Sequence, residues 1–190
     1  GVIGLGLVSG FGYWLHARRH VTPLLDFRLL RIRTFLVSVL AGTLFRIGIG
    51  AIPFLLPMML QLTFDKSAVQ SGLITFASSL GALFMKPVAT GALRRFGFRD
   101  TLVLNGAVST CLFAVMAAFR PSWPVLLITG VLLIGGFFRS LQFTAFNALA
   151  YADISRPQMS AATAFYATMQ QVSLTIGVSL GAAALAIAMA

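Results

Sequence analysis

Long apolar segments separated by short polar connectors make up most of this chain. They span 34–62, 70–93, 101–119, 123–150 and 161–190. Each has about the 20 residues that an α-helix needs to cross a hydrocarbon core about 30 Å thick. A shorter apolar stretch at 1–15 predicts the end of a further spanning helix. The pattern predicts helices because the backbone of a helix is satisfied within the segment, whereas spanning strands would be shorter and alternate in polarity.

The composition supports an all-α membrane protein. Hydrophobic residues make up 58% of the 190 residues and charged residues only 9%, whereas a soluble domain carries about 25% charged residues. Lipid must therefore be the solvent for much of the chain.

The placement of the basic residues predicts the orientation in the membrane. If 16–33 is cytoplasmic, the connectors on that side hold nine arginines: Arg18, Arg19, Arg28, Arg31, Arg33, Arg94, Arg95, Arg99 and Arg156. The opposite side holds only Lys66 and Arg120, which is the positive-inside pattern. The net charge of +10 is therefore interpreted as topology-setting, and no nucleic-acid partner is expected. Within the linker, 23–30 either lies along the membrane surface or is an ordinary solvated segment.

Two arginines lie near the middle of apolar segments: Arg46 in 34–62 and Arg139 in 123–150. A charge at that depth is unfavourable by about 2.5–3.5 kcal/mol on insertion scales. Such a residue either faces a cavity or a partner, or is satisfied by backbone carbonyls and by snorkelling. We favour a cavity, which predicts a transporter with a polar interior. Arg46 is flanked at four-residue spacing by Gly42 and Gly50, so a neighbouring helix could approach it closely.

Further polar side chains extend this predicted cavity wall. Arg139, Gln142 and Asn147 recur at helical spacing and are expected to share a face, and Gln170 adds an amide from the last segment. Amides like these either line a solute cavity or join helices directly, and the sequence leaves both readings open. A stripe of small residues at positions 173, 177 and 181 predicts close helix packing.

Two prolines interrupt the segment that carries Arg46. Pro53 and Pro57 remove backbone donors and are expected to kink this helix. A kink of this kind either bends as a gate or only shapes the helix.

Residues for enzyme chemistry are lacking in the sequence. There is no Glu, and the four Asp residues all fall in connectors, so the apolar segments offer no carboxylate for proton transfer. The single Cys111 has no metal-ligand companions, and no phosphate-binding glycine loop is present. We expect no enzyme, no cofactor and no metal site.

Four strings carry a resemblance that covers essentially the whole chain: 23–35, 44–57, 138–147 and 160–171. They resemble the major facilitator superfamily, and within it the fourteen-helix drug:proton antiporter branch, whose members are multidrug efflux pumps. The first string looks like the linker before the second six-helix bundle, and the second string is similar to the first helix of that bundle.

The cytoplasmic loop signature of this superfamily is present in part. It reads roughly Gly-x-Leu-x-Asp-Arg-x-Gly-x-Arg, whereas 91–99 is one residue shorter and lacks the Asp. The matching positions are Gly91, Arg95, Gly97 and Arg99.

The resemblance implies a domain organisation and a function. In this reading 1–15 ends a linker helix, 16–33 is a cytoplasmic linker, and 34–190 is an incomplete C-terminal bundle, so the chain is a fragment. The implied function is proton-coupled multidrug export by alternating access in a bacterial cytoplasmic membrane. The expected partners are a small-molecule substrate, the lipid bilayer and the N-terminal bundle of the same protein. The alternatives are an uptake symporter of the superfamily and a non-transporting membrane subunit.

Overall fold

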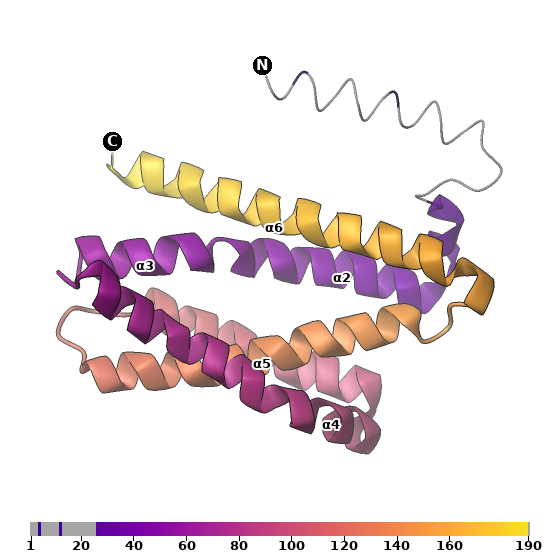
Figure 1. Ribbon diagram of the computed structural model, residues 1–190, viewed down its shortest axis with the longest axis horizontal. Coiled ribbons are helices and arrows are strands. Elements are labelled where there is room, and N and C mark those ends of the chain that lie inside the picture. The colour runs from indigo at the N-terminus through magenta and orange to yellow at the C-terminus, as the bar shows by residue number, and fades with distance from the viewer. Residues whose placement is uncertain (1–3, 5–11, 13–25, 190) are drawn as a thin grey trace.

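The computed structural model describes residues 26–189 together with Gly4 and Gly12. The helix end predicted at 1–15 and most of the linker predicted at 16–33 lie outside these residues. The described part is helical, with elements in the order η1 (Phe27–Arg31), α2 (Arg33–Gly50), α3 (Ile52–Leu62), α4 (Ala68–Ala117), α5 (Val125–Tyr151), η2 (Arg156–Gln158) and α6 (Met159–Met189). In Figure 1, α6 lies along α2 and α3, and α4 and α5 lie together on their other side.

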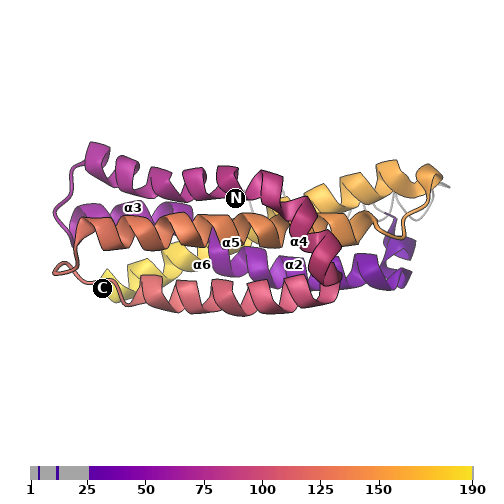
Figure 2. The same ribbon diagram turned by 90° about the horizontal axis from the view of Figure 1, so that it is seen from below.

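Helix α4 is a hairpin of two helices. It has 50 residues, which as one straight helix would be roughly 75 Å long at about 1.5 Å per residue. Gly97 interrupts it with φ 73° and ψ 173°, a conformation that is essentially restricted to glycine. Figure 2 shows the two parts, 68–96 and 98–117, running in opposite directions with α5 between them. The connector predicted at 94–100 is helical on both sides of this residue, so Asp100 lies on the second helix.

The predicted segment 34–62 divides into α2 and α3 at Ala51. Pro53 lies in the first turn of α3, where its missing N–H leaves no bond broken. Pro57 lies inside α3, and its carbonyl accepts a hydrogen bond from the Ser71 hydroxyl of α4 at 3.2 Å. The interruption therefore falls two residues before the first proline.

Glycines set the closest helix crossings. A Cβ added at Gly81 of α4 would lie 1.9 Å from the carbonyl oxygen of Leu133, and one at Gly136 of α5 would lie 2.0 Å from that of Ser78. No side chain fits at either distance, so α4 and α5 are in backbone contact here. This is the crossing that small residues make possible in membranes.

Helices α2 and α6 approach each other in the same way. A Cβ at Gly177 would lie 2.5 Å from the carbonyl oxygen of Ile47, and one at Gly181 would lie 2.5 Å from the Cβ of Ala51. The Ser173 hydroxyl lies 3.1 Å from that of Thr43. The prediction of close packing along the stripe at 173, 177 and 181 is confirmed.

Four helical stretches of the described part are long and apolar enough to cross a membrane: Arg33–Leu62, Ala68–Ala117, Val125–Tyr151 and Arg156–Ile187. Large apolar side chains are exposed along them, Leu44 and Leu126 among others. Figures 1 and 2 place η1, the Gly97 hairpin and η2 at the same end of the bundle, which gathers the described arginines of those connectors there.

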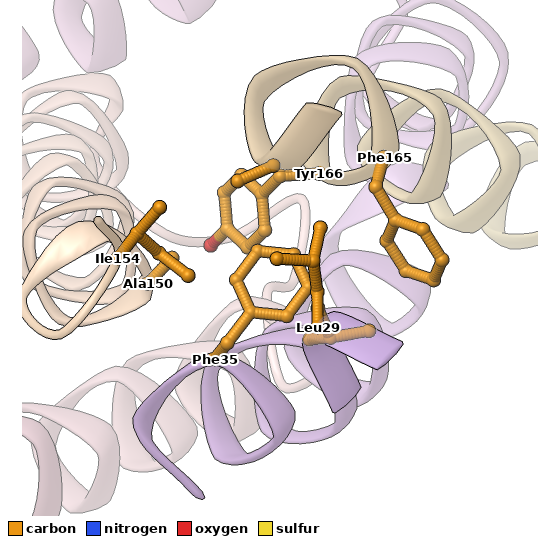
Figure 3. Packing of buried hydrophobic residues seen from close by; sticks show 8 residues of the cluster. Leu29, Phe35, Ala150, Ile154, Phe165 and Tyr166 are labelled. Atoms are coloured by element: carbon orange, nitrogen blue, oxygen red, sulfur yellow. The ribbon is translucent and has the colours of Figure 1, made fainter. Parts of the chain in front are cut away.

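A hydrophobic cluster closes that end. It joins η1, α2, α5 and α6 through Leu29, Phe35, Ala150 and Phe165, with Tyr166 also buried in it. Figure 3 shows the rings of Phe35 and Tyr166 lying side by side, with Ala150 near them. The ring centroids of Phe35 and Tyr166 are 6.2 Å apart. This packing fixes the position of Tyr166.

Candidate functional site

Arg46 is held in an aromatic cage between three helices. The residue projects from α2 and is 0% exposed. Its Nη2 donates a hydrogen bond to the hydroxyl of Tyr166 on α6 at 2.7 Å. Its guanidinium carbon lies 4.8 Å from the centroid of the Tyr166 ring and 5.5 Å from that of Phe143 on α5. Both distances are within the range of a cation–π interaction, so aromatic rings and one hydroxyl surround this charge.

Gly42 provides the space that this guanidinium occupies. A Cβ at Gly42 would lie 2.7 Å from Nη1 of Arg46, so the side chain folds back along its own helix. Gly42 thus makes room for Arg46, whereas Gly50 makes room for α6, against the Leu174 carbonyl. The Nε and Nη1 atoms of Arg46 have no hydrogen-bond partner among the described residues. The buried charge is therefore only partly compensated.

Arg139 lies in a different environment. It projects from α5, is half-buried, and donates from Nη2 to the hydroxyl of Ser78 on α4 at 2.8 Å. It lines a cavity of about 340 Å³ between α3, α4 and α5. Pro53 and Pro57 lie on the wall of the same cavity. The structure therefore brings Arg139, which was predicted to line a cavity, together with the two prolines, which were predicted to kink a helix.

Gln142 joins α5 to the second part of α4. It is 4% exposed. Its Oε1 accepts from Nδ2 of Asn105 at 2.5 Å, and its Nε2 donates to the carbonyl of Leu102 at 3.2 Å. Asn105 also donates to the carbonyl of Phe138 at 2.9 Å. In this conformation Gln142 therefore connects helices.

Asn147 and Gln170 pair with each other. Nε2 of Gln170 on α6 donates to Oδ1 of Asn147 on α5 at 2.9 Å, and both residues are half-buried. The pair links two helices that have few other contacts.

The five predicted cavity residues thus have different partners and do not converge on one cavity. Arg46 faces α6, Arg139 and Gln142 face the two parts of α4, and Asn147 pairs with Gln170. Arg139, Gln142 and Asn147 do not share one face toward a single cavity, because α5 is surrounded by neighbours on several sides. Asn105 and Ser78 also belong to this set of polar contacts and were not predicted. The available signal was weak: each is a small polar residue in an otherwise apolar segment.

The residues of the partial loop signature lie at the hairpin of α4. Gly97 makes the reversal, and a Cβ at Gly91 would meet nothing within 4 Å. The guanidinium carbon of Arg95 lies 5.8 Å from the centroid of the Phe96 ring, and Arg99 is exposed. These positions lie at the arginine-rich end of the bundle, the end formed by η1, the Gly97 hairpin and η2, and away from the cavity of Arg139.

A second cavity of about 440 Å³ lies beside that of Arg139. It is lined almost entirely by apolar side chains, with Met58 and Met59 of α3 among them. Ile52, Leu56 and Met116 line both cavities. Two cavities therefore adjoin, one that contains a guanidinium in its wall and one that is apolar, and they share three lining side chains.

The chain matches the Major Facilitator Superfamily over residues 20–188. Helical spans that bear internal arginines and a cavity agree with this match, and the chain belongs to that superfamily. It is a multi-pass membrane protein of a transporter family and not an enzyme.

The chain is similar to several curated bacterial proteins. The chain is 34% identical over 182 residues to a protein of Pectobacterium atrosepticum named "Putative multidrug resistance protein MdtD". Proteins of the same name from Serratia proteamaculans and from Escherichia coli O6:H1 are each 31% identical over 183 residues. These alignments cover 94–95% of this chain and 38% of each relative. No solved structure matches the chain.

Proposed function

We propose that the chain forms part of a secondary active transporter that exports drugs in exchange for protons by alternating access. The observation that carries this proposal is Arg139, a half-buried cation that lines a cavity inside an apolar helix bundle. An ionisable group at this depth indicates a solute pathway by default. Membership of the superfamily and the printed name of the relatives support the same function.

The proposed membrane arrangement has five crossings in the described part. They are α2 with α3, the two parts of α4, α5 and α6, and together they form most of a C-terminal bundle. We place the arginine-rich end in the cytoplasm and the protein in the bacterial cytoplasmic membrane. The positive-inside pattern supports this orientation. The remaining bundle, in the part of the relatives that the chain does not cover, would supply the other wall of the pathway.

The five site residues receive two kinds of role in this proposal. Arg139 faces the solute. Arg46, Gln142, Asn147 and Gln170 shape the cavity side of the bundle, since their polar groups hold α2, α4, α5 and α6 in register. The break at Ala51, with Pro53 and Pro57 beyond it, lets α3 tilt against α2 as the cavity opens and closes.

Proton transfer is proposed to use residues outside the described spans. The four acids of the chain lie at helix ends: Asp26 caps η1, Asp65 follows α3, Asp100 follows the hairpin residue, and Asp153 accepts from Thr34 at 2.9 Å. None lies beside Arg46 or Arg139 along the spans.

The test is drug resistance in bacteria that express the complete transporter containing this chain. Arg139→Ala is expected to reduce resistance to the level of an empty vector while the amount of protein in the membrane stays unchanged. Arg46→Ala is expected to do the same. Lys86→Ala is the matched control, because Lys86 is exposed on α4 and should leave resistance unchanged. Resistance retained by both arginine variants would reject the assignment of these residues to the pathway.

A further inference from the structure

The cavity at Arg139 has unused capacity to bind an anion. Within residues 26–189, the guanidinium donates to the Ser78 hydroxyl alone, whereas an arginine has five N–H donors. Ser78 accepts that bond, and its own hydroxyl proton has no acceptor among residues 26–189. A guanidinium beside a hydroxyl matches the geometry of a carboxylate or sulfonate.

Among residues 26–189, no acidic side chain pairs with Arg139. All four acids of the chain lie at helix ends, and the nearest in sequence, Asp153, bonds Thr34. A cationic solute in this cavity would be repelled by the guanidinium, while an anionic solute would be attracted to it. The cavity therefore selects by charge.

The adjoining cavity fits a hydrocarbon group. It adjoins the Arg139 cavity and shares the lining side chains of Ile52, Leu56 and Met116 with it. Its methionines are flexible and polarisable, which suits ligands of varied shape. With volumes of about 340 and 440 Å³, each cavity lies within the size range of small-molecule sites, about 300–1,000 Å³.

We propose that these two cavities form one site for an amphipathic organic anion. The carboxylate or sulfonate binds Arg139 and Ser78, and the hydrocarbon tail extends past Met116 toward Met58 and Met59. The role of this site in export depends on the transport function proposed above, but the binding itself can be measured separately.

The test uses three probes with the same eight-carbon tail: octanoate, octanol and octyltrimethylammonium. The complete transporter is placed in nanodiscs of neutral phosphatidylcholine, and binding is measured from the concentration dependence of its thermal unfolding. Octanoate is expected to bind at least tenfold more tightly than either of the other probes. Equal binding of octanoate and octyltrimethylammonium would overturn the proposal.

Variants locate the two ends of the ligand. Arg139→Gln is expected to weaken octanoate at least tenfold, Arg139→Lys by less, and the exposed control Lys86→Gln not at all. Met59→Trp reduces the space for the tail, so it is expected to remove the affinity gained from octanoate to decanoate while Arg139 is intact. If Arg139→Gln fails to fold, octanoate binding by the Ser78→Ala and Met59→Trp variants still tests the proposed site. An octanoate affinity that neither Ser78→Ala nor Met59→Trp changes would refute the proposed site.

An anionic lipid could supply the same chemistry as a soluble anion. Adding phosphatidylglycerol to the nanodiscs distinguishes them: octanoate binding should remain within threefold, and a tenfold loss would assign the site to lipid and overturn the proposal. Failure of the two proposals is also distinguishable. If octanoate binds as expected but Arg139→Gln leaves resistance unchanged, the export function fails and the site stands.

Discussion

The cage around Arg46 yields a quantitative prediction about stability. Tyr166→Phe removes the hydroxyl that accepts from the guanidinium at 2.7 Å but keeps the ring, whose centroid lies 4.8 Å from the charge. Since Nε and Nη1 of Arg46 already lack partners among the described residues, the substitution leaves a buried cation without this acceptor.

The expected effect follows from two magnitudes. A neutral hydrogen bond between membrane helices contributes about 0.6 kcal/mol on average and about 1.7 at most, whereas one to a charged group contributes about 1.5–3 kcal/mol. Arg46 is charged and fully buried, so the second range applies. We expect Tyr166→Phe to lower the free energy of unfolding by about 2 kcal/mol and to lower the midpoint of thermal unfolding accordingly.

Arg46→Leu should behave differently. It removes the cost of burying the charge, about 2.5–3.5 kcal/mol, together with the hydrogen bond and two cation–π interactions of about 0.5–2 kcal/mol each. The interactions lost total about 2.5–7 kcal/mol, so the net effect of Arg46→Leu is expected to lie between neutral and a loss of about 4 kcal/mol. In Arg46→Leu protein the Tyr166 hydroxyl no longer accepts a hydrogen bond from a buried cation. Tyr166→Phe should therefore lower the free energy of unfolding by less than about 0.5 kcal/mol in that protein.

The assay is thermal unfolding of the purified complete transporter in a neutral detergent, for the two single variants and the double variant. Tyr151→Phe is the matched control. The Tyr151 ring packs on Tyr166 with centroids 5.8 Å apart, and this substitution also removes a tyrosine hydroxyl, but one that does not bond Arg46. Its effect should stay within about 0.5 kcal/mol. If Tyr166→Phe costs the same with and without Arg46, the guanidinium is not what the hydroxyl stabilises, and the reasoning is refuted.

Three further predictions use the same assay. Gly81→Ala should cost about 3 kcal/mol or more because its Cβ would meet a backbone oxygen at 1.9 Å. The control Gly130→Ala should be neutral or stabilising, since a Cβ there meets nothing within 4 Å. Equal effects of the two substitutions would contradict the close crossing of α4 and α5. Gly97→Ala should cost about 1–3 kcal/mol from its positive φ, and no loss would mean that the hairpin turns elsewhere. Gln142→Leu should cost about 0.6–1.7 kcal/mol by removing its hydrogen bond with Asn105, and a smaller loss in Asn105→Leu protein would show the coupling.

Much of the fold could be predicted from local sequence. Apolar segments of about 20 residues specify membrane spans whatever their neighbours are, because the bilayer is the same solvent for each. The stripe at 173, 177 and 181 predicted close packing because only small residues let backbones touch. The reversal inside α4 was likewise predicted, at the polar connector 94–100, but local sequence did not show that a single residue, Gly97, makes it.

The surroundings of the two buried arginines could be known only from the tertiary structure. The sequence by itself determined that Arg46 and Arg139 lie deep in apolar helices, because depth follows from counting along a helix. Only the packed bundle decided that Tyr166 and Phe143 enclose Arg46, whereas Ser78 and an open cavity face Arg139. The physical reason is that helical periodicity fixes the direction of a side chain from its own axis but not the helix it meets. That neighbour is set by crossings such as Gly81 with Leu133, between residues far apart along the chain.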